Sequence, residues 1–217
     1  MKDLYKELAE YTGRELELVR QRCRIAGIEL SWLWEKFKDD PIAFYRETDL
    51  YIFDLTSYQM ALQRNKVHIW YQYMIKQYGW KTGLDYGGGI GEYTILAFEA
   101  GINRMVFMEV ANSETLKYAV WRIKKHNLYG EKKRVPIIEI ASENYKIDRD
   151  FDFIMVMDVL EHLENPEPVI KKLHEHTEWI FCNPKQIRYN WLYPQHISKF
   201  DLSPYFENVD LYLWRRK

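Results

Sequence analysis

Apolar residues recur at helical spacing along the first 80 positions of the chain. Between positions 16 and 37 they follow one another three or four residues apart, which predicts an amphipathic helix over 16–37. Thr12 and Glu15 lie three positions apart just before this segment. That is the spacing of a capping box, so it predicts where the helix begins.

Two more helices are predicted before position 80. Asp40-Pro41 combines a residue that caps helix N-termini with one that suits a first helical turn. A helix is therefore expected to begin there and to run through the aromatic stretch 44–58. Another helix is expected over 61–78, where it ends at a glycine. We assign residues 1–79 to a helical extension or lid.

A different pattern begins at Trp80, where short apolar runs alternate with helical segments. We expect strands at 82–86, 104–110, 135–140, 151–157 and 179–182, and helices at 92–100, 113–127 and 167–174. Buried strands joined by helices form a parallel sheet that is covered on both faces. The predicted fold class is therefore α/β, a doubly wound, mostly parallel sheet within residues 80–217. One last strand, at 209–214, would leave the C-terminal edge of this sheet abbreviated.

Charge and cysteine content narrow the classes of function. The 217 residues include 31 Lys and Arg against 32 Asp and Glu, a net charge of −1, which disfavours non-specific binding to nucleic acid. The basic run 122–134 is expected to be a solvated helix end. Two cysteines without a CxxC pair suit a reducing compartment. The charged start and the absence of a long apolar run argue against a signal peptide and a membrane span. We expect a cytoplasmic protein.

The glycine-rich segment 83–92 carries the strongest chemical signal. It lies between a predicted strand and helix, where glycines let a ligand approach main-chain N–H groups. A dinucleotide motif would need glycine at position 92, and a phosphate loop would need a Lys-Ser/Thr pair; the chain has neither. Asp85 and Glu92 instead suit a ligand with positive charge. Glu109, after the second strand, suits two ribose hydroxyls. A ribose and a cation without phosphate describe S-adenosylmethionine.

At these positions the chain resembles class I S-adenosylmethionine-dependent methyltransferases. The matching residues are LDYGGGIG (84–91), Glu109 after MVFM, and DVLEHL (158–163) after the fourth strand. The last motif is typical of the small-molecule branch that includes the ubiquinone-biosynthesis type. The resemblance covers about residues 80–183 and implies a Rossmann-like methyltransferase fold, with the cofactor-binding catalytic domain in 80–217.

The resemblance also implies roles for individual residues. Asp85, the glycines and Glu109 would hold the methionine and ribose parts, Val110 would lie beside the adenine, and Asp158 and Leu160 would line the cleft near the methyl group. Where the family often has a Gly-Asp pair for the adenine, this chain has Ser142 and Glu143. The complete predicted cofactor set is Asp85, Tyr86, Gly87, Gly88, Gly89, Glu109, Val110, Ser142, Glu143, Asp158 and Leu160. The product would be S-adenosylhomocysteine.

Two histidines compete for the role of general base. His162 follows the fourth strand and His196 lies in a late loop, and the unperturbed pKa of histidine, about 6.5, suits proton transfer. A structural role for each, or catalysis without a base, stays open. The run 174–176 places two histidines two positions apart, so they do not share a helix face. We predict no metal site.

Aromatic residues are concentrated on both sides of the predicted cofactor region. They could form a roof that excludes water and favours a small, flat or apolar methyl acceptor. We expect only a minority of them to face a ligand. The candidates are Tyr45, Tyr51, Phe53, Tyr58, Tyr189, Trp191, Tyr193 and Phe200. Two other functions stay open: a methyltransferase that acts on RNA or protein, and a cofactor-binding module without activity.

Overall fold

The computed structural model describes residues 3–126, 128, 137–183 and 193–217. Five helices precede the first strand: α1 Leu4–Thr12, α2 Leu16–Trp34, α3 Pro41–Glu47, α4 Tyr51–Met60 and α5 Leu62–Tyr78. No helix in these ranges is both long and apolar enough to cross a membrane.

The helical boundaries correct two of the predictions. Thr12 does not cap α2, because it is the last residue of α1 and its hydroxyl donates back to the carbonyl of Leu8 at 2.8 Å. Gly13 ends α1 in the left-handed conformation (φ 66°). The helix expected through 44–58 is divided into α3 and α4, because Thr48 adopts an extended conformation and its hydroxyl accepts from Leu50 N–H. Asp40 caps α3 as predicted.

The described residues from position 82 onward include one seven-stranded sheet. Its strands are β1 Thr82–Tyr86, β2 Arg104–Met108, β3 Ile137–Ala141, β4 Phe153–Met155, β5 Trp179–Phe181, β6 Phe206–Asp210 and β7 Leu213–Arg216. The helices among them are α6 Glu92–Ala100, α7 Glu114–Lys125, the 3₁₀ turn η1 Leu160–His162 and α8 Glu167–His176. The order is β3-β2-β1-β4-β5-β7-β6, with β1 to β5 parallel. The predicted α/β class is confirmed.

The C-terminal edge differs from the prediction of one strand at 209–214. Residues 206–216 form two antiparallel strands, and β7 inserts between β5 and β6. A half-buried strand alternates between buried and exposed side chains, but residues 206–210 do not show this pattern. Glu207, Asn208 and Val209 are all exposed, because they lie on the edge strand. The sheet therefore has one more strand at this edge than the sequence suggested.

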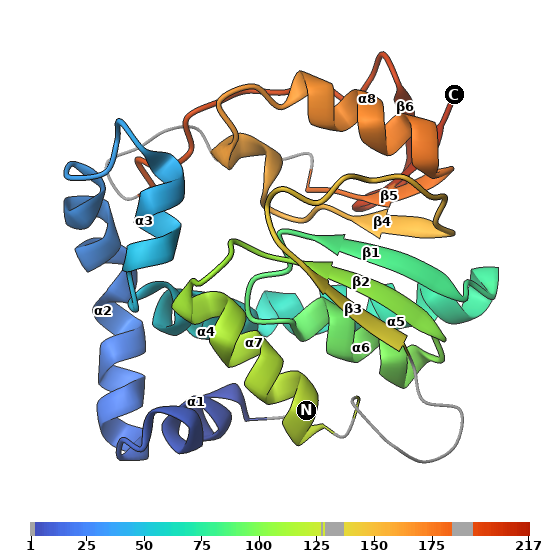
Figure 1. Ribbon diagram of the computed structural model, residues 1–217. Coiled ribbons are helices and arrows are strands. Elements are labelled where there is room, and N and C mark those ends of the chain that lie inside the picture. The colour runs from blue at the N-terminus through green and yellow to red at the C-terminus, as the bar shows by residue number, and fades with distance from the viewer. Residues whose placement is uncertain (1–2, 127, 129–136, 184–192) are drawn as a thin grey trace.

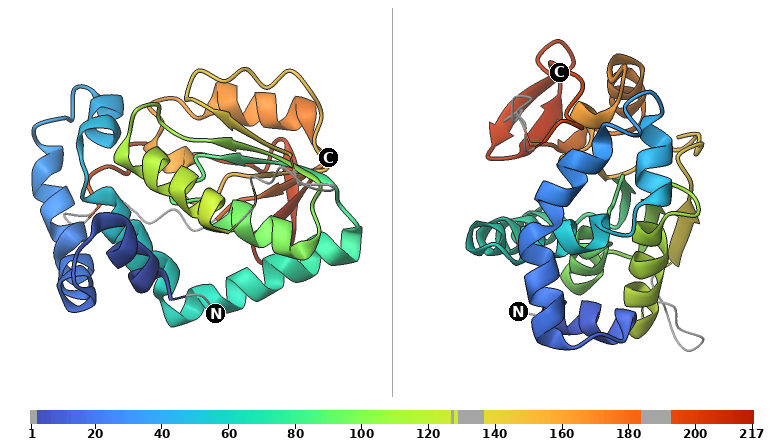
Figure 2. Two further views of the ribbon diagram at one scale, coloured as in Figure 1. Left: turned by 60° about the horizontal axis from the view of Figure 1, so that its bottom comes forward. Right: turned by 90° about the vertical axis from the view of Figure 1, so that its left-hand side faces the viewer.

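Each face of the sheet packs against helices (Figures 1 and 2). Side chains of β2 alternate between the two faces, with Met105 and Phe107 packed against α5, α6 and α7 and Val106 packed with α8. All three are fully buried. The parallel strands point toward α2, α3 and α4, which lie beyond their carboxyl ends (Figure 1). Ligands of open α/β sheets bind in that crevice.

A buried ion cluster joins the N-terminal helices to the sheet. Arg122 on α7 is fully buried and donates to Glu7 of α1 at 2.7 Å and to Glu92 of α6 at 2.6 Å. Its third contact, 2.8 Å, is with the carbonyl of Ile90 in the glycine-rich turn. Arg122 therefore does not belong to a solvated basic run, and α1 is fixed directly to the turn that follows β1.

Candidate functional site

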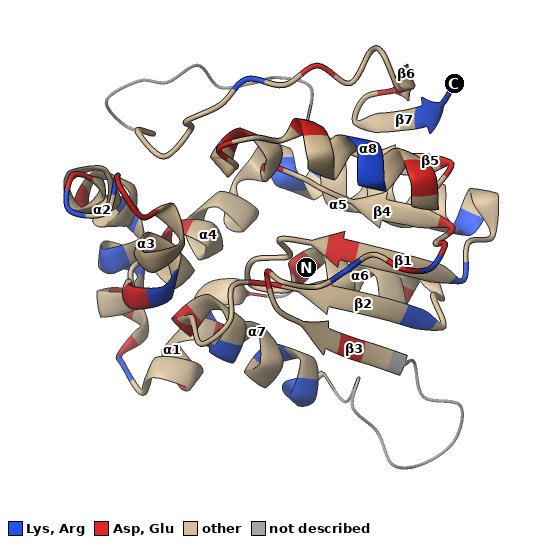
Figure 3. Cartoon of the chain, turned by 45° about the horizontal axis from the view of Figure 1, so that its top comes forward, with Lys and Arg blue, Asp and Glu red and all other residues tan. Residues whose placement is uncertain are grey.

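A cavity of about 680 Å³ lies at the carboxyl ends of the parallel strands. The turns after β1, β2, β3 and β4 form one side, and α3, α4 and the segment 193–196 form the other. Within the described residues, its lining contains no Lys or Arg. It contains six carboxylates: Asp54, Asp85, Glu109, Glu143, Asp158 and Glu161. Asp and Glu also mark the end of β1 in Figure 3. This lining favours a ligand that carries positive charge or hydrogen-bond donors.

The glycine-rich turn lies close to two neighbouring strands. Gly87 has φ 67°, and a Cβ there would lie 2.8 Å from a methyl carbon of Val159. Gly88 donates to the carbonyl of Met108 at 2.9 Å, and a Cβ on it would lie 2.4 Å from the ring of Phe107. Position 87 therefore requires glycine because of its positive φ, and position 88 requires it because a side chain would not fit.

The two acids on either side of this turn have different environments. Asp85 is buried at the edge of the cavity and accepts from the Thr94 hydroxyl at 2.7 Å. Burial raises the pKa of Asp85 to about 6. Glu92 is buried too, but its carboxylate is paired with Arg122 and it does not line the cavity. The prediction that Glu92 attracts a cationic ligand is therefore wrong, because its charge is already neutralised inside the protein.

Glu109 follows β2, and its carboxylate is held by two backbone donors. Gly89 N–H donates to Oε2 at 2.7 Å and Val110 N–H donates to Oε1 at 2.9 Å. Burial raises the pKa of Glu109 to about 7, although these two hydrogen bonds act in the opposite direction. Each oxygen keeps a further lone pair, so the ionised carboxylate can accept two hydroxyl hydrogens at the cavity surface.

The predicted adenine end is only partly as expected. Val110 and Glu143 line the cavity, whereas Ser142 does not. The Glu143 carboxylate accepts from Ala111 N–H at 2.7 Å and pairs with Arg46 at 3.1 Å, which lowers the pKa of Glu143. Asn144 also lines the cavity, and the sequence analysis missed it.

Asp158 is the centre of a polar cluster after β4. It accepts from Tyr58 and Asn183, both at 2.8 Å, and from Arg64 at 2.5 Å. Arg64 is buried, lies 3.8 Å from the Tyr58 ring centroid and was not predicted, because nothing local marks a partner 94 positions away. Leu160 is fully buried in the core and does not line the cavity, so its predicted place in the cleft is wrong.

The aromatic candidates divide into three groups. Tyr45, Tyr51, Tyr58 and Tyr193 line the cavity. Tyr45 and Tyr51 pack with their rings 5.2 Å apart and at 72°. Phe53 and Phe200 pack within core clusters instead. Tyr189 and Trp191 lie outside the described residues.

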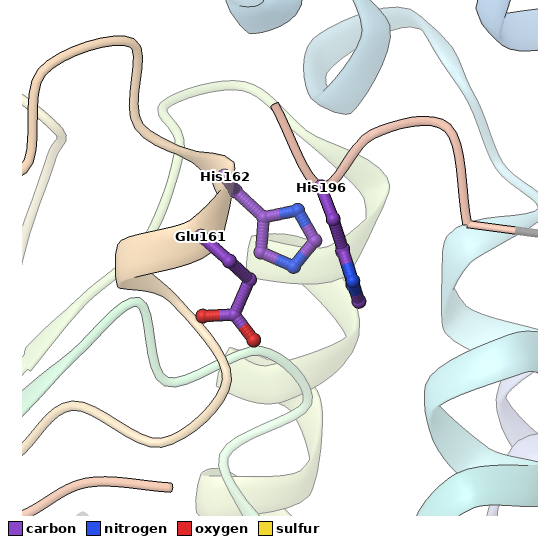
Figure 4. A group of neighbouring side chains, drawn as sticks. All are labelled: Glu161, His162 and His196. Atoms are coloured by element: carbon purple, nitrogen blue, oxygen red, sulfur yellow. The ribbon is translucent and has the colours of Figure 1, made fainter. Parts of the chain in front are cut away.

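His162 and His196 meet at the part of the cavity beside the turn that follows β4, with Glu161 next to them (Figure 4). Their ring centroids are 4.7 Å apart. His162 Nδ1 lies 3.2 Å from the carbonyl of Gln195 and 2.9 Å from the Tyr45 hydroxyl. Burial and the neighbouring His196 lower the pKa of His162 to about 3. Burial and the charge of Asp158 raise the pKa of Glu161 to about 7.

Several solved structures are similar to this chain. The N-methyltransferase NodS from Bradyrhizobium japonicum, in complex with S-adenosylhomocysteine, has 14% sequence identity and a TM-score of 0.56 over 81% of this chain and 96% of NodS. Magnesium protoporphyrin IX methyltransferase (ChlM) from Synechocystis PCC 6803, with bound S-adenosylhomocysteine, has 15% identity and a TM-score of 0.49 over 62% of each chain.

The N-terminal domain of EvdMO1, in the presence of S-adenosylhomocysteine and D-fucose, has 14% identity and a TM-score of 0.45. That match covers 57% of this chain and 54% of the EvdMO1 chain, so it spans about half of that protein's length. No curated protein matches this sequence.

A match to a family model is stronger evidence of family membership than similarity to any single solved structure. The model described as a methyltransferase domain matches residues 12–186, which includes α2 to α5 as well as the sheet up to β5. The chain therefore belongs to the methyltransferase domain family.

Proposed function

We propose that this enzyme transfers the methyl group of S-adenosylmethionine to a small molecule with a flat or apolar part and a reactive oxygen, nitrogen or carbon atom. One observation carries the proposal. A single cavity joins the Glu109 carboxylate to a group of tyrosines and to the Glu161, His162 and His196 side chains.

The cofactor would occupy the half of the cavity over β1, β2 and β3. Glu109 would accept both ribose hydroxyls, with Val110 beside the adenine ring. Asn144 and Glu143 follow β3 and are the candidates for the adenine amino group. Asp85 would lie near the methionine part, where its negative charge favours the cofactor's ammonium and sulfonium groups.

The acceptor would then lie over β4, between its following turn and the tyrosines of α3 and α4. Tyr45, Tyr51 and Tyr193 offer ring surfaces there. Such surfaces would exclude water and stabilise a sulfonium by about 0.5–2 kcal/mol each. The acceptor atom attacks the methyl carbon as the S–CH₃ bond breaks, and the bond's electron pair stays on sulfur. The enzyme contributes mainly alignment to this step.

Of the two predicted bases, only His196 is compatible with that role. A general base works best when its pKa is near the working pH, and the pKa of His162 is about 3 because the ring is buried beside His196. His162 Nδ1 is also engaged with Gln195 and Tyr45.

The proposal is tested with labelled S-adenosylmethionine and a panel of hydroxylated and aminated aromatic compounds, with RNA and unfolded polypeptide as alternative acceptors. We expect turnover with small acceptors. The Tyr51→Leu and Tyr193→Leu variants should raise acceptor KM without changing S-adenosylhomocysteine affinity. Tyr73→Leu is the control, because Tyr73 is exposed on α5 away from the cavity lining. Turnover with RNA or polypeptide alone would overturn the proposal.

A further inference from the structure

Three side chains with metal-binding atoms converge at the acceptor end of the cavity. Glu161 and His162 are adjacent in η1, and His196 comes from a segment 34 positions later. One ligand atom from each lies within 4.8 Å of the other two. Figure 4 shows the carboxylate and the two rings directed into the same space.

We propose that Glu161, His162 and His196 bind a divalent first-row transition-metal ion. Two imidazoles and one carboxylate suit such ions, whereas Mg²⁺ prefers oxygen ligands and several waters. Three protein ligands leave coordination positions for other groups, which is the arrangement of catalytic rather than structural metal sites. The prediction of no metal site rested on residues 174–176 alone, and His162 and His196 were considered only as bases.

The hydrogen bonds of His162 favour a ligand role. A carbonyl oxygen only accepts, so the hydrogen bond to Gln195 forms when the ring proton is on Nδ1. Nε2 then keeps its lone pair, and that ring edge faces Glu161 and His196 in Figure 4. Metal-binding histidines commonly donate their other N–H to a carbonyl or carboxylate, which fixes the tautomer and the ring orientation. Tyr45 adds a second contact at the same Nδ1, 2.9 Å away.

Glu161 lacks the counter-charge that its neighbour has. It is 5% exposed, and its own backbone N–H donates to the carboxylate. The buried Arg64 is engaged by Asp158 instead. Burying a carboxylate without a charged partner is costly, so a bound cation would stabilise its ionised form.

The spacing requires the three ligand atoms to move closer together on binding. Metal–nitrogen and metal–oxygen bonds of about 2.0–2.2 Å place the ligand atoms of a tetrahedral site about 3.3–3.6 Å apart. From the 4.8 Å limit the atoms have at most about 1.5 Å to close, which rotation of the His196 and Glu161 side chains would supply.

A metal ion bound by Glu161, His162 and His196 would limit which methyl acceptors the cavity binds. This step rests on the proposed function. An ion beside the tyrosines would select acceptors with an oxygen donor and lower the pKa of a hydroxyl. The hydroxyl proton would leave to solvent, the O–CH₃ bond would form as the S–CH₃ bond breaks, and S-adenosylhomocysteine would depart. His196 would then act as a ligand and not as a base.

The test is a titration of chelator-treated enzyme with Co²⁺, followed by its visible absorption, and with Zn²⁺ by calorimetry. We expect one ion per chain, with Mg²⁺ a weak competitor. Glu161→Gln, His162→Gln and His196→Gln should each weaken binding more than about 100-fold, and Tyr45→Phe by about 10-fold or more.

The matched controls are Glu175→Gln and His174→Gln on α8, a Glu and a His outside the cavity lining that should leave the affinity unchanged. S-adenosylhomocysteine affinity is measured on every variant, and retained affinity shows that the fold is intact. Absence of Co²⁺ and Zn²⁺ binding by an enzyme that binds S-adenosylhomocysteine would overturn the metal site and leave the proposed function standing. Equal metal affinity in the three ligand variants and the wild type would overturn it too, as would a preference for Mg²⁺. Failure to bind S-adenosylhomocysteine would count against the function instead.

Discussion

Replacing Glu109 with glutamine would test the ribose contact with little change in shape. The ionised carboxylate can accept both ribose hydroxyls, whereas an amide offers one oxygen and no charge. A hydrogen bond to a charged group contributes about 1.5–3 kcal/mol, so the loss of one predicts a rise in the Kd for S-adenosylhomocysteine of roughly 10- to 150-fold. Glu109→Ala removes both acceptors and also leaves the N–H groups of Gly89 and Val110 without their partner. Its effect should exceed about 150-fold.

Isothermal titration calorimetry at pH 8 measures the Kd for S-adenosylhomocysteine, and thermal unfolding shows whether each variant is folded. Together they separate a loss of binding from a loss of stability. Burial raises the pKa of Glu109 to about 7, so at pH 8 the carboxylate is ionised and its buried charge destabilises the folded protein. Glutamine removes this charge but can accept from only one of the two backbone donors, so the unfolding temperature at pH 8 should change little. Glu139→Gln is the control, because Glu139 is a half-exposed acid of β3 paired with Arg149 and lies outside the cavity lining. A Kd within about threefold of wild type in both folded Glu109 variants would refute the ribose role.

Three further results are expected. The affinity for S-adenosylhomocysteine should fall about 30-fold between pH 8 and pH 5.5 in calorimetry, because Glu109 with a pKa of about 7 becomes protonated as the pH falls; a constant Kd would contradict this. Gly88→Ala should destabilise the protein by about 1–3 kcal/mol in urea unfolding and weaken cofactor binding, because the new methyl would lie 2.4 Å from the Phe107 ring. Arg122→Met should cost about 3–5 kcal/mol in the same assay, because Glu92 and Glu7 both lose the buried guanidinium. Lys125→Met at the helix surface should cost under about 1 kcal/mol; equal costs would show that the buried cluster adds nothing.

Local patterns were enough to predict the elements around the glycine-rich turn. β1 and α6 have the predicted bounds, because an apolar strand, a run of glycines and a capped helix lie within 20 consecutive residues. Strand ends and helix starts were displaced by a few residues elsewhere. The division of 44–58 into two helices was missed because it depends on one extended residue, Thr48, inside a helical pattern.

Long-range charge pairing could not be predicted in the same way. Arg122 appeared to belong to a solvated basic run, yet it pairs with Glu7, 115 positions away. Arg64 likewise neutralises Asp158, and Glu161 joins His196 only because the segment after β5 returns to the end of β4. Each of these contacts is produced by chain topology, and sequence spacing carries no sign of it.

The most direct test of the account is a crystal structure of the complex with S-adenosylhomocysteine. We predict both ribose hydroxyls within hydrogen-bonding distance of the two Glu109 oxygens, and the sulfur directed toward the end of the cavity that holds His196. A nucleoside bound away from Glu109, or a sulfur directed away from the tyrosines, would contradict it.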